Sequence, residues 1–220
     1  MGYGVVGILR KVLISGLFAC CGFAATAEPV VIAALGDSLT HGFGLVEQDG
    51  FVPQMEEWLI EQGADVRMIN AGVSGDTTAG GAARVNWTLT PDVDGMIVAL
   101  GGNDLLRGID PAASRANLVK ILTEAQQADV DVLLIGMQAP GNYGPEYKQA
   151  FDAMYPALAQ EFDTLYVESF FVGLQPDGDP NAVRQFMQPD GIHPNARGVA
   201  RIVEGLGPKV MDLVRQARQD

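Results

Sequence analysis

The stretch VVIAALGDSLTHGFG, residues 30–44, begins as an apolar run and ends in glycine and polar residues. An apolar run without polar alternation is typical of a strand that is buried on both faces of a sheet. The change of composition at Gly36 predicts that the chain leaves the sheet there, which places Ser38 at the start of a helix. The stretch therefore raises two questions: which kind of sheet contains the strand, and what the serine at its end does.

Further strands and helices are predicted along the rest of the chain. Apolar runs rich in β-branched residues recur at residues 65–70, 95–100, 131–137 and 164–169. The segments between them have helical periodicity, which predicts helices at 52–62, 77–89, 111–128, 146–162 and 195–218, the last with a kink at Gly207-Pro208. Buried strands that alternate with helices predict βαβ units, so the fold class is α/β, with a parallel sheet covered on both faces.

The N-terminal segment, residues 1–27, has the three parts of a secretory signal peptide. Two basic residues precede an apolar run over 12–18, and the segment ends in Ala25-Thr26-Ala27. The run is too short for a transmembrane helix, so we expect no stable membrane insertion of the mature chain. The sequence thus predicts an exported protein, periplasmic or secreted, with one domain over residues 28–220.

Both cysteines, Cys20 and Cys21, lie in this segment, so the mature chain has no disulfide and no thiolate metal site. Cleavage before Cys20 with acylation of that residue is a second reading, which would give a lipoprotein. Bulky Phe18 stands where such a cleavage site needs a small residue, which disfavours it.

The mature domain is strongly acidic. The leader holds two basic and no acidic residues, so 12 basic and 27 acidic residues remain, a net charge of −15. Such a surface repels phosphate backbones and excludes nucleic acid as a partner.

Ligands of open α/β sheets bind at the carboxyl ends of the strands, and Ser38 follows the first strand. Serine is also a common helix N-cap, so Ser38 alone does not indicate catalysis. The loop QPDGIHPN, residues 188–195, changes this, because Asp190 can orient the His193 ring and leave Nε2 free to accept a serine proton. The other histidine, His41, has no such partner, and we expect it at the rim of the site or on the surface.

Acyl transfer also needs donors that stabilise an oxyanion. Gly72, in NAGVSG, permits close approach of its backbone, and Asn103, in GGND, presents a side-chain amide. Each also has an ordinary reading, as a turn glycine or a loop asparagine.

With these residues the sequence resembles the SGNH hydrolases, also called GDSL-type esterases and lipases, in the branch of thioesterase I, arylesterase and lysophospholipase. The resemblance rests on ordered blocks across the mature chain: LGDSLTHGFG, NAGVSGDTTAGG, LGGNDLLRGI, NYGPEYKQAF and DGIHPNARG. It implies a three-layer sandwich with a five-stranded parallel sheet of flavodoxin-like order. It also implies Ser38 as nucleophile, His193 as base and Asp190 as its partner, an oxyanion hole of Ser38, Gly72 and Asn103, and neither metal nor cofactor.

The resemblance places Tyr143 in a substrate-binding loop, and His41 stands where related sequences have a small residue. Four apolar residues before the Asp-His loop either line an acyl groove or belong to the core: Phe171, Leu174, Phe186 and Met187. We expect a serine esterase of short-to-medium acyl or aryl esters, with lysophospholipids and thioesters as further substrates. The alternatives are a carbohydrate deacetylase of the same superfamily, a non-catalytic secreted binding module, and a lipoprotein that serves mainly for envelope attachment.

Overall fold

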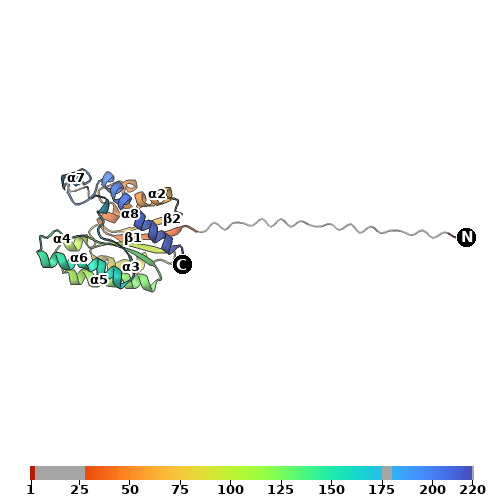
Figure 1. The fold of residues 1–220 in the computed structure, drawn as a ribbon, viewed down its shortest axis with the longest axis horizontal. Helices are drawn as coiled ribbons and strands as arrows, with labels where there is room; N and C mark the ends of the chain where they lie inside the picture. The colour runs from red at the N-terminus through yellow and green to blue at the C-terminus, as the bar shows by residue number, and fades with distance from the viewer. Residues whose placement is uncertain (3–27, 175–179, 220) are drawn as a thin grey trace.

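The computed structural model describes residues 1–2, 28–174 and 180–219. Residues 3–27 of the predicted signal peptide, with both cysteines, lie outside the described residues. Figure 1 shows a central sheet between two layers of helices.

The sheet is parallel and has five strands in the order β2-β1-β3-β4-β5. The strands are β1 (Val30–Gly36), β2 (Val66–Gly72), β3 (Gly95–Ala99), β4 (Asp131–Ile135) and β5 (Leu165–Val167). This is the flavodoxin-like order, so the predicted fold class is confirmed. Every residue of β1 and β3 is buried, as their unbroken apolar sequences predict.

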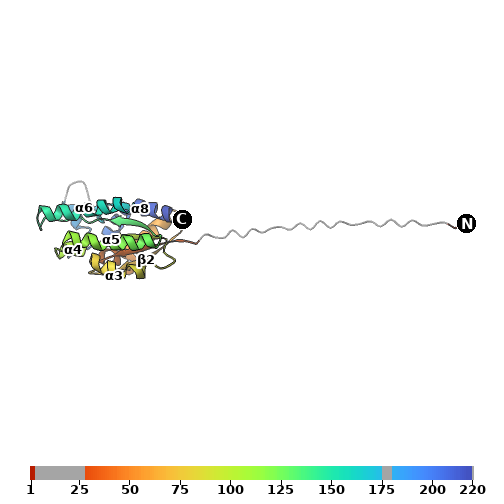
Figure 2. The same cartoon turned by 90° about the horizontal axis from the view of Figure 1, so that it is seen from below.

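Helices cover both faces of the sheet. The long helices are α2 (Phe51–Glu61), α3 (Thr78–Thr88), α5 (Pro111–Gln127), α6 (Pro145–Glu161) and α8 (Ala196–Ala217). Helices α2 and α8 pack together on one face, while α3, α5 and α6 form the layer on the other, which Figure 2 shows from below. Helix α8 continues through Pro208 without a break, so it is a single element rather than two.

Short elements lie where strands and helices meet. They are the helices α1 (Ser38–His41), α4 (Gly102–Leu106) and α7 (Pro180–Arg184), and the 3₁₀ turns η1 (Glu47–Asp49) and η2 (Val172–Leu174). None of the helices in the described parts of the chain is long and apolar enough to cross a bilayer. Helices α1 and α4 follow the carboxyl ends of β1 and β3, so both lie at the edge of the sheet where ligands bind in this class of fold.

Candidate active site

Ser38 is the first residue of α1, but it is not the residue that caps the helix. Asp37 is the N-cap, and its Oδ1 accepts the N–H of Leu39 at 3.0 Å. The Ser38 hydroxyl is therefore free for another partner. Its Oγ lies 2.8 Å from Nε2 of His193, although 155 residues separate the two in sequence.

His193 is held from its other side by Asp190. The Nδ1 atom of the ring lies 2.7 Å from Oδ2 of Asp190. The second carboxylate oxygen, Oδ1, accepts the backbone N–H groups of Ile192 and His193 at 2.9 and 3.0 Å. These bonds, first that from the His193 N–H and then that from its ring, lower the pKa of Asp190 to about 2. The carboxylate is therefore ionised at neutral pH, as an orienting partner of an imidazole must be.

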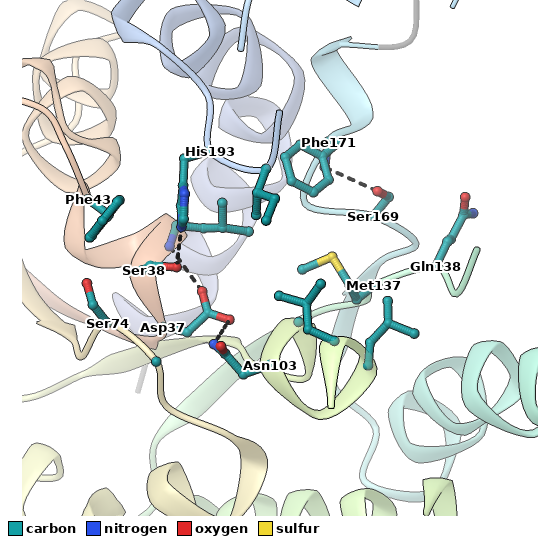
Figure 3. A pocket seen from close by; sticks show the side chains of 16 residues that line it. Asp37, Ser38, Phe43, Ser74, Asn103, Met137, Gln138, Ser169, Phe171 and His193 are labelled. Atoms are coloured by element: carbon teal, nitrogen blue, oxygen red, sulfur yellow. Dashed lines mark hydrogen bonds between the residues drawn. The ribbon is translucent and has the colours of Figure 1, made fainter. Parts of the chain in front are cut away.

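An aromatic ring packs against the imidazole. The centroids of the Phe43 and His193 rings are 4.6 Å apart, and Figure 3 shows Phe43 beside the histidine above Ser38. Phe43 comes just after α1, so the segment that carries Ser38 also supports His193.

Asp37 is 2 % exposed and lies under Ser38 and His193. Desolvation raises its pKa to about 6, although the Leu39 N–H, the nearby His193 and the Asn103 amide all favour the charged form. Its Oδ2 lies 3.4 Å from Nδ2 of Asn103, and Figure 3 shows this contact at the floor of the site.

Asn103 lies on α4, which a buried carboxylate fixes in place. The Nδ2 atom of Asn103 also donates to the carbonyl of Asp76 at 2.9 Å. The next residue, Asp104, is fully buried and accepts from the N–H of Thr78 at 2.8 Å and from the hydroxyls of Thr78 and Ser114 at 2.5 and 2.8 Å. Helices α3, α4 and α5 thus meet at one satisfied carboxylate, which holds the asparagine before it against the site.

The structure does not place Gly72, the expected oxyanion donor, at the cavity. Gly72 is the last residue of β2, its N–H already donates to Oδ1 of Asn70 at 3.0 Å, and it does not line the cavity. Gly75, three residues later, does line the cavity and has a φ of +85° that favours glycine. No acceptor for the Gly75 N–H lies within hydrogen-bond distance in the described parts of the chain. The positive φ that distinguishes Gly75 from Gly72 is not visible in the sequence.

A cavity of about 500 Å³ opens beside Ser38 and His193. Its apolar lining consists of Leu39, Phe43, Leu105, Leu106, Met137, Phe171 and Ile192. Figure 3 shows Met137 and Phe171 across the cavity from Phe43, so an apolar group of a ligand would lie next to the serine hydroxyl.

The predicted substrate-side residues separate into two groups. Of the four apolar candidates, only Phe171 lines this cavity. Leu174 is buried in the core, and the Phe186 ring lies beneath the guanidinium of Arg197, at 5.4 Å. Tyr143 does not line the cavity either; its hydroxyl donates to the carbonyl of Leu106, a lining residue, at 3.2 Å.

His41 is exposed, as expected of a residue at the rim of the site. Its Nδ1 lies 2.9 Å from the hydroxyl of Ser74, which lines the cavity. In the described parts of the chain, no three His, Cys, Asp or Glu side chains are arranged to hold a metal ion.

Comparison with known proteins gives one consistent result. Residues 34–201 match the model of the GDSL-like lipase/acylhydrolase family. The chain is 36% identical over 207 residues to "Esterase TesA" of Pseudomonas aeruginosa, which covers 94% of this chain and 100% of that protein.

Two further proteins extend this likeness. The chain is 35% identical over 195 residues to "Thioesterase 1/protease 1/lysophospholipase L1" of Escherichia coli K12, 87% of each chain. Among solved structures, AlinE4, an SGNH-hydrolase family esterase, is 42% identical, with a TM-score of 0.69 over 86% of this chain and 98% of that one.

Proposed function

Since the chain belongs to the GDSL-like lipase/acylhydrolase family, we propose that its reaction proceeds through Ser38, with His193 as base and Asp190 as the partner that orients it. The protein is an ester-hydrolysing enzyme that acts on small-molecule esters. One observation carries the assignment of roles: the unbroken series of contacts Asp190–His193–Ser38, at 2.7 and 2.8 Å, at the mouth of an apolar cavity.

The mechanism follows from these contacts. His193 Nε2 accepts the Ser38 proton as Oγ attacks the ester carbonyl, and the imidazolium that forms is stabilised by Asp190. Collapse of the tetrahedral intermediate releases the alcohol, which takes the proton from His193, and leaves an acyl-serine. Water, deprotonated by the same histidine, then hydrolyses the acyl-serine and restores the free hydroxyl.

The proposed oxyanion hole contains the N–H groups of Ser38 and Gly75 and the side-chain amide of Asn103. The N–H of Ser38 belongs to the first turn of α1, where backbone donors have no partner within the helix. One N–H of Asn103 is held by the carbonyl of Asp76, which fixes the amide plane. The other points toward Asp37 at the long distance of 3.4 Å and is available to a stronger acceptor.

We assign the apolar cavity to the acyl or aryl part of the substrate. The proposed substrates are carboxylic esters with short-to-medium acyl or aryl groups, with lysophospholipids and thioesters as further candidates from the names of the relatives. A carbohydrate deacetylase needs polar partners for sugar hydroxyls, and the predominantly apolar lining disfavours that alternative. A binding module without catalysis has no use for the aligned Ser38 and His193.

We also propose export by a signal peptide over residues 1–27, with the enzyme domain over 28–220. Mass spectrometry of the protein recovered from the producing cells tests both readings of the leader. A free N-terminus at Glu28 supports the signal peptide, while a lipid-modified Cys20 would replace it with a lipoprotein anchor.

The activity is tested with p-nitrophenyl acetate, butyrate, octanoate and palmitate as substrates, on the wild-type enzyme and on Ser38→Ala and His41→Ala variants. The proposal expects activity that is abolished in Ser38→Ala and retained in His41→Ala. Equal hydrolysis by the wild-type enzyme and the Ser38→Ala variant on every ester would overturn it.

A further inference from the structure

The two members of the catalytic pair come from opposite ends of the chain, and one glutamine side chain contacts both of the segments that carry them. Ser38 lies on α1 after β1, and His193 lies in the loop that precedes α8. The amide nitrogen of Gln188 donates to the carbonyl of Phe43 at 2.7 Å and to the carbonyl of Pro194 at 3.0 Å. Phe43 follows α1, and Pro194 is the residue after the histidine, so this amide joins the two segments.

The backbone of Gln188 is bonded to the same loop. Its N–H donates to the carbonyl of His193 at 2.7 Å, and its carbonyl accepts the N–H of Gly191 at 3.0 Å. Met187 and Pro194, which flank residues 188–193, form an isolated antiparallel bridge. These bonds hold the loop of residues 188–193 closed. The side chain of Gln188 then joins this loop to the segment that carries Ser38.

The serine segment has a glycine at the point where Gln188 approaches. Gly44 has a φ of +76°, and a Cβ built there would lie 2.3 Å from Oε1 of Gln188. A side chain at position 44 would therefore be strained by the backbone and would also displace the amide. The backbone conformation of Gly44 and the close approach of Gln188 to it both favour glycine at the point where the two segments meet.

An amide fits the pair of acceptors. Both partners of Nε2 are carbonyl oxygens, so the contacting group must have two N–H donors, which glutamine has. A glutamate in the same place would direct carboxylate oxygens at two carbonyls, and a methionine would fill the space without either bond.

We propose that Gln188 is a positioning residue that sets the distance between Ser38 Oγ and His193 Nε2 by clamping the two segments together. It does not line the cavity, and it acts through His193 rather than on the substrate. Phe43 completes the clamp, because the residue whose carbonyl accepts from Gln188 also packs its ring on the imidazole. The inference rests on the proposed roles of Ser38 and His193.

The test compares the wild-type enzyme with Gln188→Glu and Gln188→Met. The readouts are kcat and KM on p-nitrophenyl butyrate and the rate constant for inactivation by a serine-directed phosphonate, each referred to the concentration of titrated active sites. Misplacing reacting groups by about 1 Å costs on the order of 10²-fold in rate, so we expect kcat to fall about 10- to 10²-fold. The inactivation rate should fall in parallel while KM changes less than about twofold, because the cavity is untouched.

A second glutamine in the same segment is a matched control. Gln185 is exposed, and its amide nitrogen bonds only the nearby carbonyl of Ala182, at 3.2 Å, among the described residues. Gln185→Met should leave kcat and the inactivation rate unchanged. A Gln188→Met enzyme with wild-type kcat per active site would overturn the proposal, and so would an equal loss in the Gln185→Met variant.

A double-mutant cycle with Gly44→Ala separates clamping from general destabilisation. If Gly44 and Gln188 act through one contact, the double variant should lose little more kcat than the worse single variant. Fully additive losses would overturn the shared role. Failure of this proposal is distinguishable from failure of the proposed function. A Ser38→Ala variant with wild-type activity would overturn the proposed catalytic roles of Ser38 and His193. An inactive Ser38→Ala variant together with a Gln188→Met variant of normal activity would overturn only the positioning role of Gln188.

Discussion

Asp37 caps helix α1 through its Oδ1, and this leaves the hydroxyl of the adjacent Ser38 to face His193 at 2.8 Å. Two polar residues in a row at a helix start thus have different tasks. The first satisfies the backbone, and the second is the proposed nucleophile.

Substitution of the catalytic pair should abolish turnover. Ser38→Ala and His193→Ala remove the proposed nucleophile and base, so each should lower kcat by roughly 10⁴- to 10⁶-fold. Asp190→Ala should cost less, on the order of 10²- to 10⁴-fold, because Phe43 still packs on the imidazole. Steady-state kinetics on p-nitrophenyl butyrate measures all three, and circular dichroism checks that each variant is folded. A Ser38→Ala variant within tenfold of wild type would contradict the assignment.

Asn103→Ala should lower kcat by roughly 10²- to 10³-fold with little change in KM, because its amide belongs to the proposed oxyanion hole, which acts when negative charge develops on the substrate oxygen. An Asn103→Asp variant offers a control of similar size without the donor, and it should be at least as impaired. A rise in KM with unchanged kcat would show that Asn103 binds the substrate rather than the transition state.

The raised pKa of Asp37 predicts how the stability of the protein depends on pH. Burial raises its pKa from 3.8 to about 6, so the folded protein holds this proton more tightly than the unfolded chain does. Its contribution to the free energy of unfolding is therefore complete below pH 3.8 and is lost as the pH rises through 6. The shift corresponds to about 3 kcal/mol.

The Asp37→Asn variant retains a capping oxygen and lacks the titration. Urea unfolding at several pH values between 3.5 and 7 should show the wild type losing stability relative to this variant as the pH rises. A difference between the two proteins that is constant over this range would contradict a raised pKa in the folded state.

The cavity lining predicts which residues control acyl preference. Phe171→Ala removes an apolar wall, so kcat/KM for the octanoate ester should fall more than kcat/KM for the acetate ester, by roughly 10-fold or more. Phe186→Ala, whose ring lies outside the cavity lining, is the control and should leave the ratio of the two esters unchanged. An equal change of the ratio in both variants would show that the cavity is not the acyl site.

The parallel sheet could be predicted from apolar runs that alternate with helices, and the five predicted runs correspond to β1 to β5, whereas the order of the strands was implied only by the resemblance to the SGNH hydrolases. Helices α1 and α4 have four and five residues, too few for a helical period to appear in the sequence. The proposed change of oxyanion donor from Gly72 to Gly75 could not be made from the sequence, because β2 extends to Gly72, which keeps that residue in the strand, and the turn with positive φ comes only at Gly75.

The contact between Ser38 and His193 could be proposed from residue types alone, since each has a chemical role. Gln188 could not, because a glutamine next to a motif has no chemistry of its own. Its importance depends on a carbonyl 145 residues away, which only the folded chain brings near.

The most direct measurement of the central claim is the site of covalent labelling by a serine-directed phosphonate, read by mass spectrometry of the digested enzyme. The account predicts one equivalent of label on Ser38 that parallels the loss of esterase activity, and a labelling rate that collapses in His193→Ala. Ser74 lines the same cavity and provides an internal comparison. Label on Ser74, or full activity in enzyme that is labelled on Ser38, would contradict the assignment of Ser38 as the nucleophile.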